Sequence, residues 1–270
     1  MSGLKDLNDR VVVVTGASSG LGRGLARTMA ARGARVALVA RRTDRLEEVA
    51  AEIHADGGDA VVVTCDVGSP ASIEQASGKV LAWHGRIDVL VNAAGYARHL
   101  LFKDQDPADA ERMMDVNYFG IANWIRAVLP SMRTAGCGWI VNLSSFAGRL
   151  GQPDEASYAA TKFAVTGLSE SLAMELEPLG IHVMCVYPVL VRTEMFDDAT
   201  LARMPERTRN SFIEVDEFCD TVLAALARGA YEVTVPRRFG LIYLLRLLFP
   251  GMMRKQTAAI RLPILPDLKR

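Results

Sequence analysis

The chain has 270 residues, half of them apolar, and its 31 lysines and arginines balance its 31 aspartates and glutamates. This length fits one large α/β domain, and the balanced charge favours neither nucleic acid nor a strongly acidic partner. The four cysteines (Cys65, Cys137, Cys185 and Cys219) form no Cys-x-x-Cys pair, which argues against a zinc site and a disulfide framework and predicts reduced thiols in a cytoplasmic protein.

The sequence also shows neither an export signal nor a membrane-spanning segment. The start "MSGLKDLNDR" has no apolar core, so we expect no secretion signal. No apolar run reaches the length of a membrane-spanning helix.

Seven short runs rich in β-branched residues are predicted as strands, at 11–15, 35–40, 60–65, 87–92, 138–144, 181–187 and 231–235. They are nearly continuous in apolar residues, as expected for a parallel sheet that is covered on both faces. The segments between them, such as "GLGRGLARTMAARG", repeat apolar residues every three or four positions, which indicates helices. The alternation predicts a single α/β domain with a doubly wound, mostly parallel seven-stranded sheet of the Rossmann-like type.

The stretch "TGASSGLG", residues 15–22, follows the first strand and opens the first predicted helix. At this place in a parallel sheet, backbone N–H groups and the positive end of the helix face a ligand phosphate. Gly16 would permit the tight turn, Gly20 the close approach of a pyrophosphate, and Gly22 close helix–strand packing. The spacing Gly-x-x-x-Gly-x-Gly is also compatible with an ordinary glycine turn, but its position predicts a dinucleotide loop.

The second strand ends in "VARR", with Ala40 followed by Arg41 and Arg42. An acidic residue here would bind the 2′-hydroxyl of NAD and repel a 2′-phosphate. A guanidinium can instead bind a phosphate through two charge-assisted hydrogen bonds. The pair therefore favours NADP(H), with a solvated arginine pair as the alternative.

Tyr158 and Lys162 in "YAATK" lie four residues apart, on one face of a predicted helix. A free tyrosine has a pKa of about 10, and a nearby ammonium together with a nicotinamide cation would lower it. Ser145, at the end of the preceding strand, could donate a hydrogen bond to a substrate oxygen. This combination indicates acid–base chemistry at a carbonyl or an alcohol.

With these motifs, the chain resembles the short-chain dehydrogenase/reductase family over residues 8 to 235. The resemblance implies a catalytic tetrad of Asn117, Ser145, Tyr158 and Lys162, in which Tyr158 is the general acid/base and Ser145 holds the substrate oxygen. Lys162 would bind the nicotinamide ribose and tune the tyrosine, and Asn117 would support a water in a proton relay. Family spacing favours Ser145 over Ser144.

The resemblance also implies a cofactor-binding set, including Asp66 beside the adenine, the "NAAG" segment at 92–95, and "YPVLVRT" around the nicotinamide carboxamide. The family usually has glycine where Val189 stands. The full set is Gly16, Ser18, Ser19, Gly20, Leu21, Gly22, Arg41, Arg42, Asp66, Val67, Asn92, Ala93, Ala94, Gly95, Tyr158, Lys162, Pro188, Val191 and Thr193.

Other residues carry weaker expectations. The four histidines are scattered without ligand spacing, so we assign no metal site, and His182 is expected near the core of its strand. By analogy with segments flanking the tetrad, the substrate pocket is expected to draw on Tyr96, Phe146, Leu150, Met195 and Phe196, although each is also compatible with ordinary packing. A long mixed connection at 194–215 is expected to cover a ligand.

The tail 236–270 extends beyond the catalytic region 1–235 and contains "RRFGLIYLLRLLFPGMMRK" at 237–255. This stretch is apolar on most sides and flanked by basic residues, but it is too short to span a bilayer. It would pack over the pocket, join subunits, or lie at a membrane surface as a peripheral contact.

The sequence predicts an NADP(H)-dependent oxidoreductase that interconverts a carbonyl and a secondary alcohol, on a small, hydrophobic substrate such as a steroid, an acyl chain or another lipid-like ketone. A 3-oxoacyl thioester reductase and a non-catalytic NADPH-binding scaffold are the alternatives. The family resemblance further implies a homodimer or homotetramer. Neither the substrate nor the direction of the reaction follows from the residues.

Overall fold

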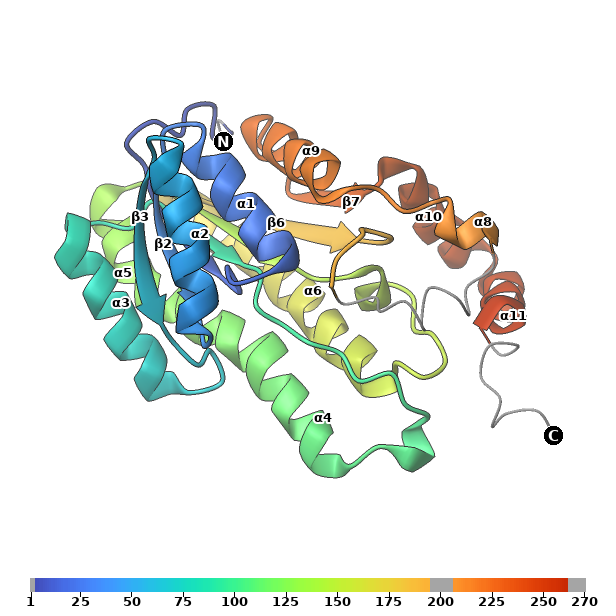
Figure 1. Ribbon diagram of the computed structural model, residues 1–270. Helices are drawn as coiled ribbons and strands as arrows, with labels where there is room; N and C mark the ends of the chain where they lie inside the picture. Colours follow the sequence, from blue (N-terminus) through green and yellow to red (C-terminus); the bar gives the residue numbers. More distant parts are fainter. Residues whose placement is uncertain (1–2, 195–205, 262–270) are drawn as a thin grey trace.

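A seven-stranded sheet forms the centre of the computed structural model, which describes residues 3–194 and 206–261 (Figure 1). The strands lie in the order β3-β2-β1-β4-β5-β6-β7, and every pairing is parallel. Their bounds are β1 Val11–Thr15, β2 Arg35–Ala40, β3 Asp59–Thr64, β4 Val89–Asn92, β5 Gly138–Leu143, β6 Ile181–Pro188 and β7 Glu232–Val235. The predicted doubly wound sheet is confirmed.

The strand order reverses between β1 and β4, because the chain first builds outward to β3 and then returns to the other side of β1. Loops at the carboxyl ends of strands diverge at such a switch point and leave a crevice for a ligand. The connecting helices are α1 Gly20–Ala30, α2 Thr43–Ala55, α3 Pro70–His84, α4 Pro107–Met114, α5 Gly120–Ala135, α6 Ala156–Leu176, α8 Glu206–Arg209 and α9 Val215–Ala227.

Two apolar clusters fill the faces of the sheet. In β1, Val12 and Val14 pack toward α1, α2 and α9, whereas Val11 and Val13 pack toward α3, α5 and α6. Both faces of the strand are therefore buried, which explains why the strands read as continuous apolar runs instead of alternating ones. His182 on β6 is buried and bonded through Nε2 to the Ala230 carbonyl at 3.0 Å, as expected.

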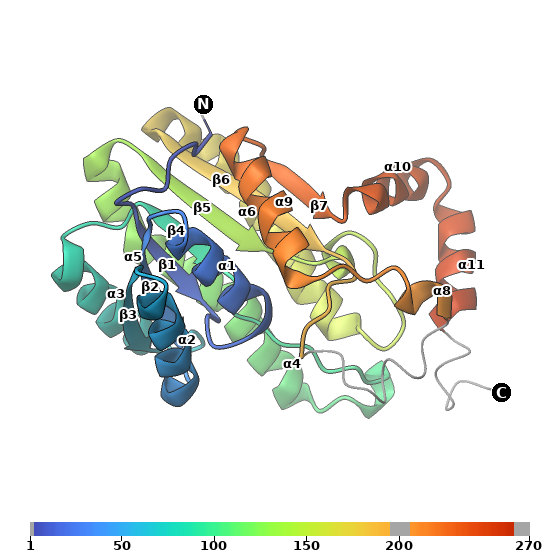
Figure 2. The same ribbon diagram turned by 45° about the horizontal axis from the view of Figure 1, so that its top comes forward.

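After β7 the chain forms two further helices, α10 Gly240–Leu248 and α11 Pro250–Arg261. Figure 2 shows β7 pointing toward α10, with α8, α10 and α11 gathered at that end of the molecule. Among the described residues, no helix combines the length and the apolar character needed to cross a membrane. The tail thus continues from the carboxyl edge of the sheet, where the site lies.

Candidate active site

A cavity of about 1020 Å³ opens along the carboxyl edge of the sheet. It runs from the glycine loop, across the end of β4, to the segment after β6 and the helices of the tail. Of the predicted cofactor-binding residues, all except Asn92 line it: Gly16, Ser18, Ser19, Gly20, Leu21, Gly22, Arg41, Arg42, Asp66, Val67, Ala93, Ala94, Gly95, Tyr158, Lys162, Pro188, Val191 and Thr193.

The glycine loop is shaped by two close backbone approaches. A Cβ on Gly16, which has a φ of +69°, would lie 2.8 Å from the backbone of Ala94, and a Cβ on Gly22 would lie 2.3 Å from the carbonyl oxygen of Gly16. Side chains at these positions would push the loop off the strand ends. The loop leads directly into α1, whose first turn contains no acidic residue, so its N-terminus is favourable for an anion.

The two arginines after β2 lie on the rim of this loop. Arg42 donates to the hydroxyls of Ser18 and Ser19 at 3.0 and 2.8 Å, and Arg41 is exposed and lines the cavity. The negative charge of Asp66 in this region is offset by Arg112, which donates to both of its carboxylate oxygens at 2.9 and 2.6 Å. The pKa of Asp66 is lowered: burial raises it, but hydrogen bonds from Gly68 and Arg112 outweigh that effect.

Asn92 supports the cavity from beneath instead of lining it. Its amide donates to Oδ1 of Asn142 at 2.9 Å, and Asn142 donates to Ser169 at 3.0 Å. This buried chain of polar groups links β4, β5 and α6. Asn142 and Ser169 were not singled out in the sequence, because neither lies in a recognisable motif.

Tyr158, Ser145 and Lys162 meet at the inner wall of the cavity. Burial raises the pKa of Tyr158 to about 12, and a hydrogen bond with Ser145 opposes this rise. Burial also lowers the pKa of Lys162 to about 8. The sequence predicted a lowered tyrosine pKa. In the protein residues alone the direction is the opposite, because burial of the hydroxyl outweighs the hydrogen bond with Ser145. The Lys162 ammonium lies over the ring, with Nζ 5.7 Å from its centroid.

The two neighbouring serines have different surroundings. The Ser144 hydroxyl is buried and donates to the Lys162 carbonyl at 2.9 Å, so it ties β5 to α6. The Ser145 hydroxyl accepts from the Ala147 N–H at 3.1 Å and interacts with Tyr158. This geometry agrees with the choice of Ser145 as the residue that faces the substrate oxygen.

Asn117 is fully buried and does not line the cavity. It lies in a π-helical turn, Asp115–Phe119, between α4 and α5. Its amide donates to the Tyr96 carbonyl at 3.0 Å and to the Thr161 hydroxyl at 3.1 Å, while its oxygen accepts from the Tyr96 N–H at 3.0 Å. Asn117 thus fastens the segment after β4 to α6, one residue before Lys162. The π turn and Thr161 were not anticipated from the sequence.

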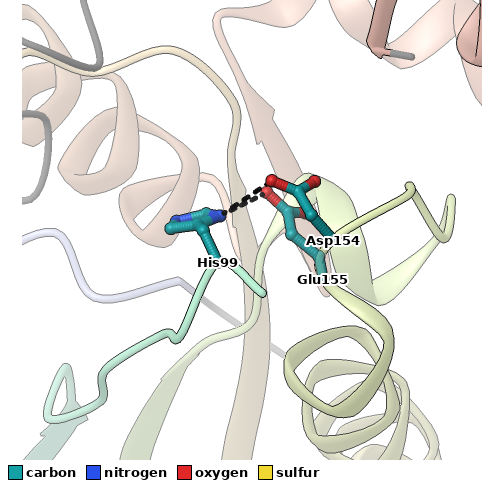
Figure 3. A group of neighbouring side chains, drawn as sticks. All are labelled: His99, Asp154 and Glu155. Carbon is teal, nitrogen blue, oxygen red and sulfur yellow. Dashed lines mark ion pairs between the residues drawn. The ribbon is translucent and has the colours of Figure 1, made fainter. Parts of the chain in front are cut away.

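A polar group at the edge of the cavity was also missed. His99 points toward Asp154 and Glu155, with Nδ1 4.0 and 3.4 Å from their carboxylates (Figure 3). His99 and Glu155 line the cavity, and the charge of Glu155 adds to the rise of the Tyr158 pKa. The three ligand atoms lie within 4.8 Å of one another. No local motif announces the group, since His99 comes from a segment some fifty residues away in the chain.

The tail helices supply an apolar wall to the same cavity, through Phe239, Ile242, Leu245 and Met253, with Gln256 and Thr257 beside them. The expected pocket residues Tyr96, Phe146 and Leu150 also line it, as does Val189, while Met195 and Phe196 lie outside the described residues. The part of the 194–215 connection that the structure describes contributes Thr208 and Ser211 to the cavity lining.

An aromatic–cation cluster attaches α10 to the rest of the domain. The guanidinium of Arg149 lies 3.7 Å from the ring centroid of Tyr187 on β6 and 4.6 Å from that of Tyr243 on α10. Arg149 also pairs with Glu232 of β7. Phe146 contacts Tyr243 with ring centroids 5.7 Å apart. Such contacts over an arginine are favourable when partly desolvated, so they hold the tail over the cavity.

Comparison with known proteins gives relatives along most of the chain. The chain is 33% identical over 266 residues to "Dehydrogenase/reductase SDR family member 7B" of Bos taurus, covering 94% of this chain and 82% of that protein. The protein of the same name from Danio rerio is 37% identical over 196 residues, 70% of this chain and 63% of its own length. The chain therefore spans less than two thirds of that relative.

Solved structures share the fold. A gluconate 5-dehydrogenase from Burkholderia cenocepacia J2315, in complex with NADP and tartrate, is similar with a TM-score of 0.75 and 30% identity, over 85% of this chain and 93% of that one. A short chain dehydrogenase/reductase from Burkholderia phymatum, in complex with NAD, has a TM-score of 0.84 over 92% and 96% of the two chains; at 23% identity it shows the fold alone.

The family model of short chain dehydrogenases matches residues 10–203. This stretch contains the glycine loop, the arginine pair, the β4 segment and the Ser145, Tyr158 and Lys162 group described above. The chain belongs to the short-chain dehydrogenase/reductase family of oxidoreductases.

Proposed function

We propose that the protein is an NADP(H)-dependent oxidoreductase that interconverts a carbonyl and a secondary alcohol, with Tyr158 as the general acid/base. The observation that carries the proposal is one cavity in which the glycine loop and the Tyr158, Ser145 and Lys162 group occupy neighbouring parts of the wall. A dinucleotide on the loop would extend toward these side chains. Hydride and proton donors would then meet at one substrate carbon and its oxygen.

The residues present fit a dinucleotide phosphate. The glycine loop leaves no room for a Cβ at Gly16 or Gly22, which brings backbone N–H groups to the cavity at the start of α1. Arg41 at the rim and Arg42 beside the two serines place positive charge where a ribose 2′-phosphate would lie. The NADP complex of the Burkholderia cenocepacia relative supports this choice, whereas the NAD complex comes from a structure that shares the fold alone.

When bound, the nicotinamide supplies or accepts the hydride. With a pKa of about 12, the Tyr158 hydroxyl is protonated at neutral pH and can donate its proton to a carbonyl oxygen. The Ser145 hydroxyl would hold the same oxygen by a hydrogen bond and stabilise the charge that develops on it. Lys162, held by the strand end, would bind the ribose and keep the tyrosine in place. This arrangement suits reduction at neutral pH.

A hydrophobic substrate is supported by the apolar side chains that line the same cavity as the catalytic group. Phe146, Leu150, Phe239, Ile242 and Leu245 line it, three of them from the tail. Apolar surface of this kind favours a lipid-like ketone over a sugar acid. We therefore propose that residues 236–270 are an extension of the catalytic domain 1–235, that its described part, 236–261, covers the substrate part of the pocket, and that the enzyme takes part in lipid metabolism.

Two broader proposals follow from the family resemblance and from the composition. The protein would work in the cytoplasm, and it would form a homodimer or homotetramer. Sedimentation velocity of the purified chain measures the second point directly.

The experiment that tests the function combines turnover and cofactor binding. Wild-type protein is assayed with NADPH against a panel of ketones that differ in chain length, and Tyr158→Phe is assayed beside it. We expect Tyr158→Phe to lose turnover by about a thousandfold or more while its Kd for NADPH changes by about twofold or less. Full activity of Tyr158→Phe would overturn the mechanism. NADPH binding by the wild type without turnover of any carbonyl would point to a scaffold instead.

A further inference from the structure

The outer face of α10 is made of leucines. Leu241, Leu244, Leu247 and Leu248 are exposed, with Leu247 at 78%, whereas Ile242, Tyr243, Leu245 and Arg246 face inward and are partly buried. On a helix with about 100° per residue, the four leucines occupy one continuous arc of roughly 120°. A surface helix of a soluble domain normally places polar residues on that side.

The apolar surface continues into the turn between α10 and α11. Phe249 and Met252 are exposed at 53% and 42%. Among the described residues, six of the large apolar side chains that stand out in solvent therefore lie within twelve consecutive positions, 241–252. An exposed patch of this density marks a surface that another phase or molecule covers.

The charged residues of the tail segment 237–261 itself have one sign. The whole chain is neutral, but between Glu232 and Asp267 the sequence contains no acidic residue. It contains six basic ones there: Arg237, Arg238, Arg246, Arg254, Lys255 and Arg261. Arg237 precedes α10, and Arg254 and Lys255 follow the turn on α11; all three are exposed. The leucine face is thus flanked by cations at both ends.

This charge decides between two occupants. In a two-fold dimer the same patch of each subunit meets its copy, so the cations of one subunit would face those of the other. Headgroups of anionic lipids complement the cations, while the leucines and Phe249 reach the acyl boundary. We propose that the outer face of α10 and the α10–α11 turn dock on the surface of a membrane that contains anionic lipid.

The proposal gives the tail two faces with different tasks. Ile242 and Leu245 of the inner face line the cavity, as does Met253 of α11. Docking would therefore hold the apolar wall of the pocket about one helix diameter, roughly 10 Å, from the lipid. The docking itself is independent of the proposed function, because it is measured without turnover.

The test is flotation of the full-length protein with phosphatidylcholine vesicles that contain phosphatidylglycerol, and with vesicles of phosphatidylcholine alone. We expect binding to the anionic vesicles that is weakened by high salt. Leu244→Glu/Leu247→Glu should lower the partition coefficient by about 100-fold, and Arg254→Gln/Lys255→Gln by about tenfold. The matched control is Met174→Glu, which changes an equally exposed apolar residue at 72% on α6, far along the chain from the tail.

All the changed side chains are exposed, so we expect the variants to fold like the wild type. Circular dichroism and thermal unfolding check this. Binding that is lost in the tail variants and kept in Met174→Glu supports the proposal. No flotation of the wild type with anionic vesicles overturns it, as does equal binding of the leucine variant. A wild type that sediments as an oligomer, fails to float, and becomes a monomer on Leu244→Glu/Leu247→Glu would identify the face as a contact between copies of the chain and would also overturn it.

Discussion

The Lys162 ammonium donates to the main-chain carbonyl of Leu143 at 2.9 Å, and not to the hydroxyl of Tyr158. The lysine is only 5% exposed, so its ammonium is largely shielded from water. The hydrogen bond to the last carbonyl of β5 fixes its position in the cavity wall. An ammonium carries three donors, and two remain available toward the cavity that Lys162 lines. The geometry therefore suits a lysine that holds a ligand and stands beside the tyrosine.

This placement gives the first prediction, a pH dependence of cofactor binding. Burial lowers the pKa of Lys162 to about 8, so the ammonium is present below that pH and is lost as the pH rises through it. We expect the Kd for NADPH, measured by fluorescence between pH 6 and pH 10, to rise above a pH of about 8. In Lys162→Met the affinity should be lower and this inflection absent. An inflection near the ordinary lysine pKa in the wild type would contradict the assignment.

The arginine pair predicts cofactor selectivity. Arg41→Ala removes an exposed guanidinium from the rim, and we expect its Kd for NADPH to rise by about 10- to 100-fold, because a charge-assisted contact with the 2′-phosphate is lost. The Kd for NADH should change little. Arg45→Ala is the matched control, since Arg45 is exposed on α2, four residues after Arg41, pairs with Glu48 and does not line the cavity. Equal losses for both cofactors would exclude a 2′-phosphate site at Arg41.

Local patterns were sufficient for the sheet and for the parts of the site that share a motif. Tyr158 and Lys162 are four residues apart on α6, and the glycine loop joins β1 directly to α1, so spacing alone places them. The predicted strand 87–92 is shorter in the structure, β4 Val89–Asn92; just before it, the Asp88 carboxylate accepts from the Val11 N–H at 2.8 Å.

The remaining parts depend on contacts between distant segments. Glu155 reaches the cavity together with His99, and Tyr243 of the tail stacks over Arg149, but no periodicity or spacing encodes these meetings. The rise in the Tyr158 pKa is of the same kind, since desolvation depends on everything packed around the ring. The sequence of the tail is compatible with three arrangements for this reason: an apolar helix has the same residue pattern whether it faces a pocket, a subunit or lipid.

Asn117 is predicted to contribute mainly to the stability of the site. Asn117→Ala would leave the N–H and the carbonyl of Tyr96 without their partner and would remove a donor to the Thr161 hydroxyl, so we expect the free energy of unfolding to fall by ~3 kcal/mol. Urea unfolding followed by circular dichroism measures the change. Asn123→Ala on α5, whose side chain accepts from exposed Arg126, should cost about 0.5 kcal/mol or less. A loss of the same small size for Asn117→Ala would show that its bonds do not hold the segment.

Glu155 predicts a shift in the pH profile of alcohol oxidation. Its carboxylate is 9% exposed and lines the cavity, and its negative charge disfavours the Tyr158 phenolate, which is the base that oxidation requires. Glu155→Gln removes that charge, so the Tyr158 pKa should fall and the rising limb of kcat/KM for oxidation should move to lower pH. Reduction at neutral pH should change little, because the tyrosine remains protonated there.

Asp154→Asn serves as the matched control for this prediction. Asp154 belongs to the same polar group but does not line the cavity, and asparagine tolerates its positive φ of 63°. Its oxidation profile should stay close to that of the wild type. If Glu155→Gln left the limb in place, or Asp154→Asn moved it as far, the charge of Glu155 would not act on Tyr158. A shift confined to Glu155→Gln would show that this carboxylate sets the working pH through the pKa of Tyr158. Glu155 would then act in addition to the four residues of the family tetrad.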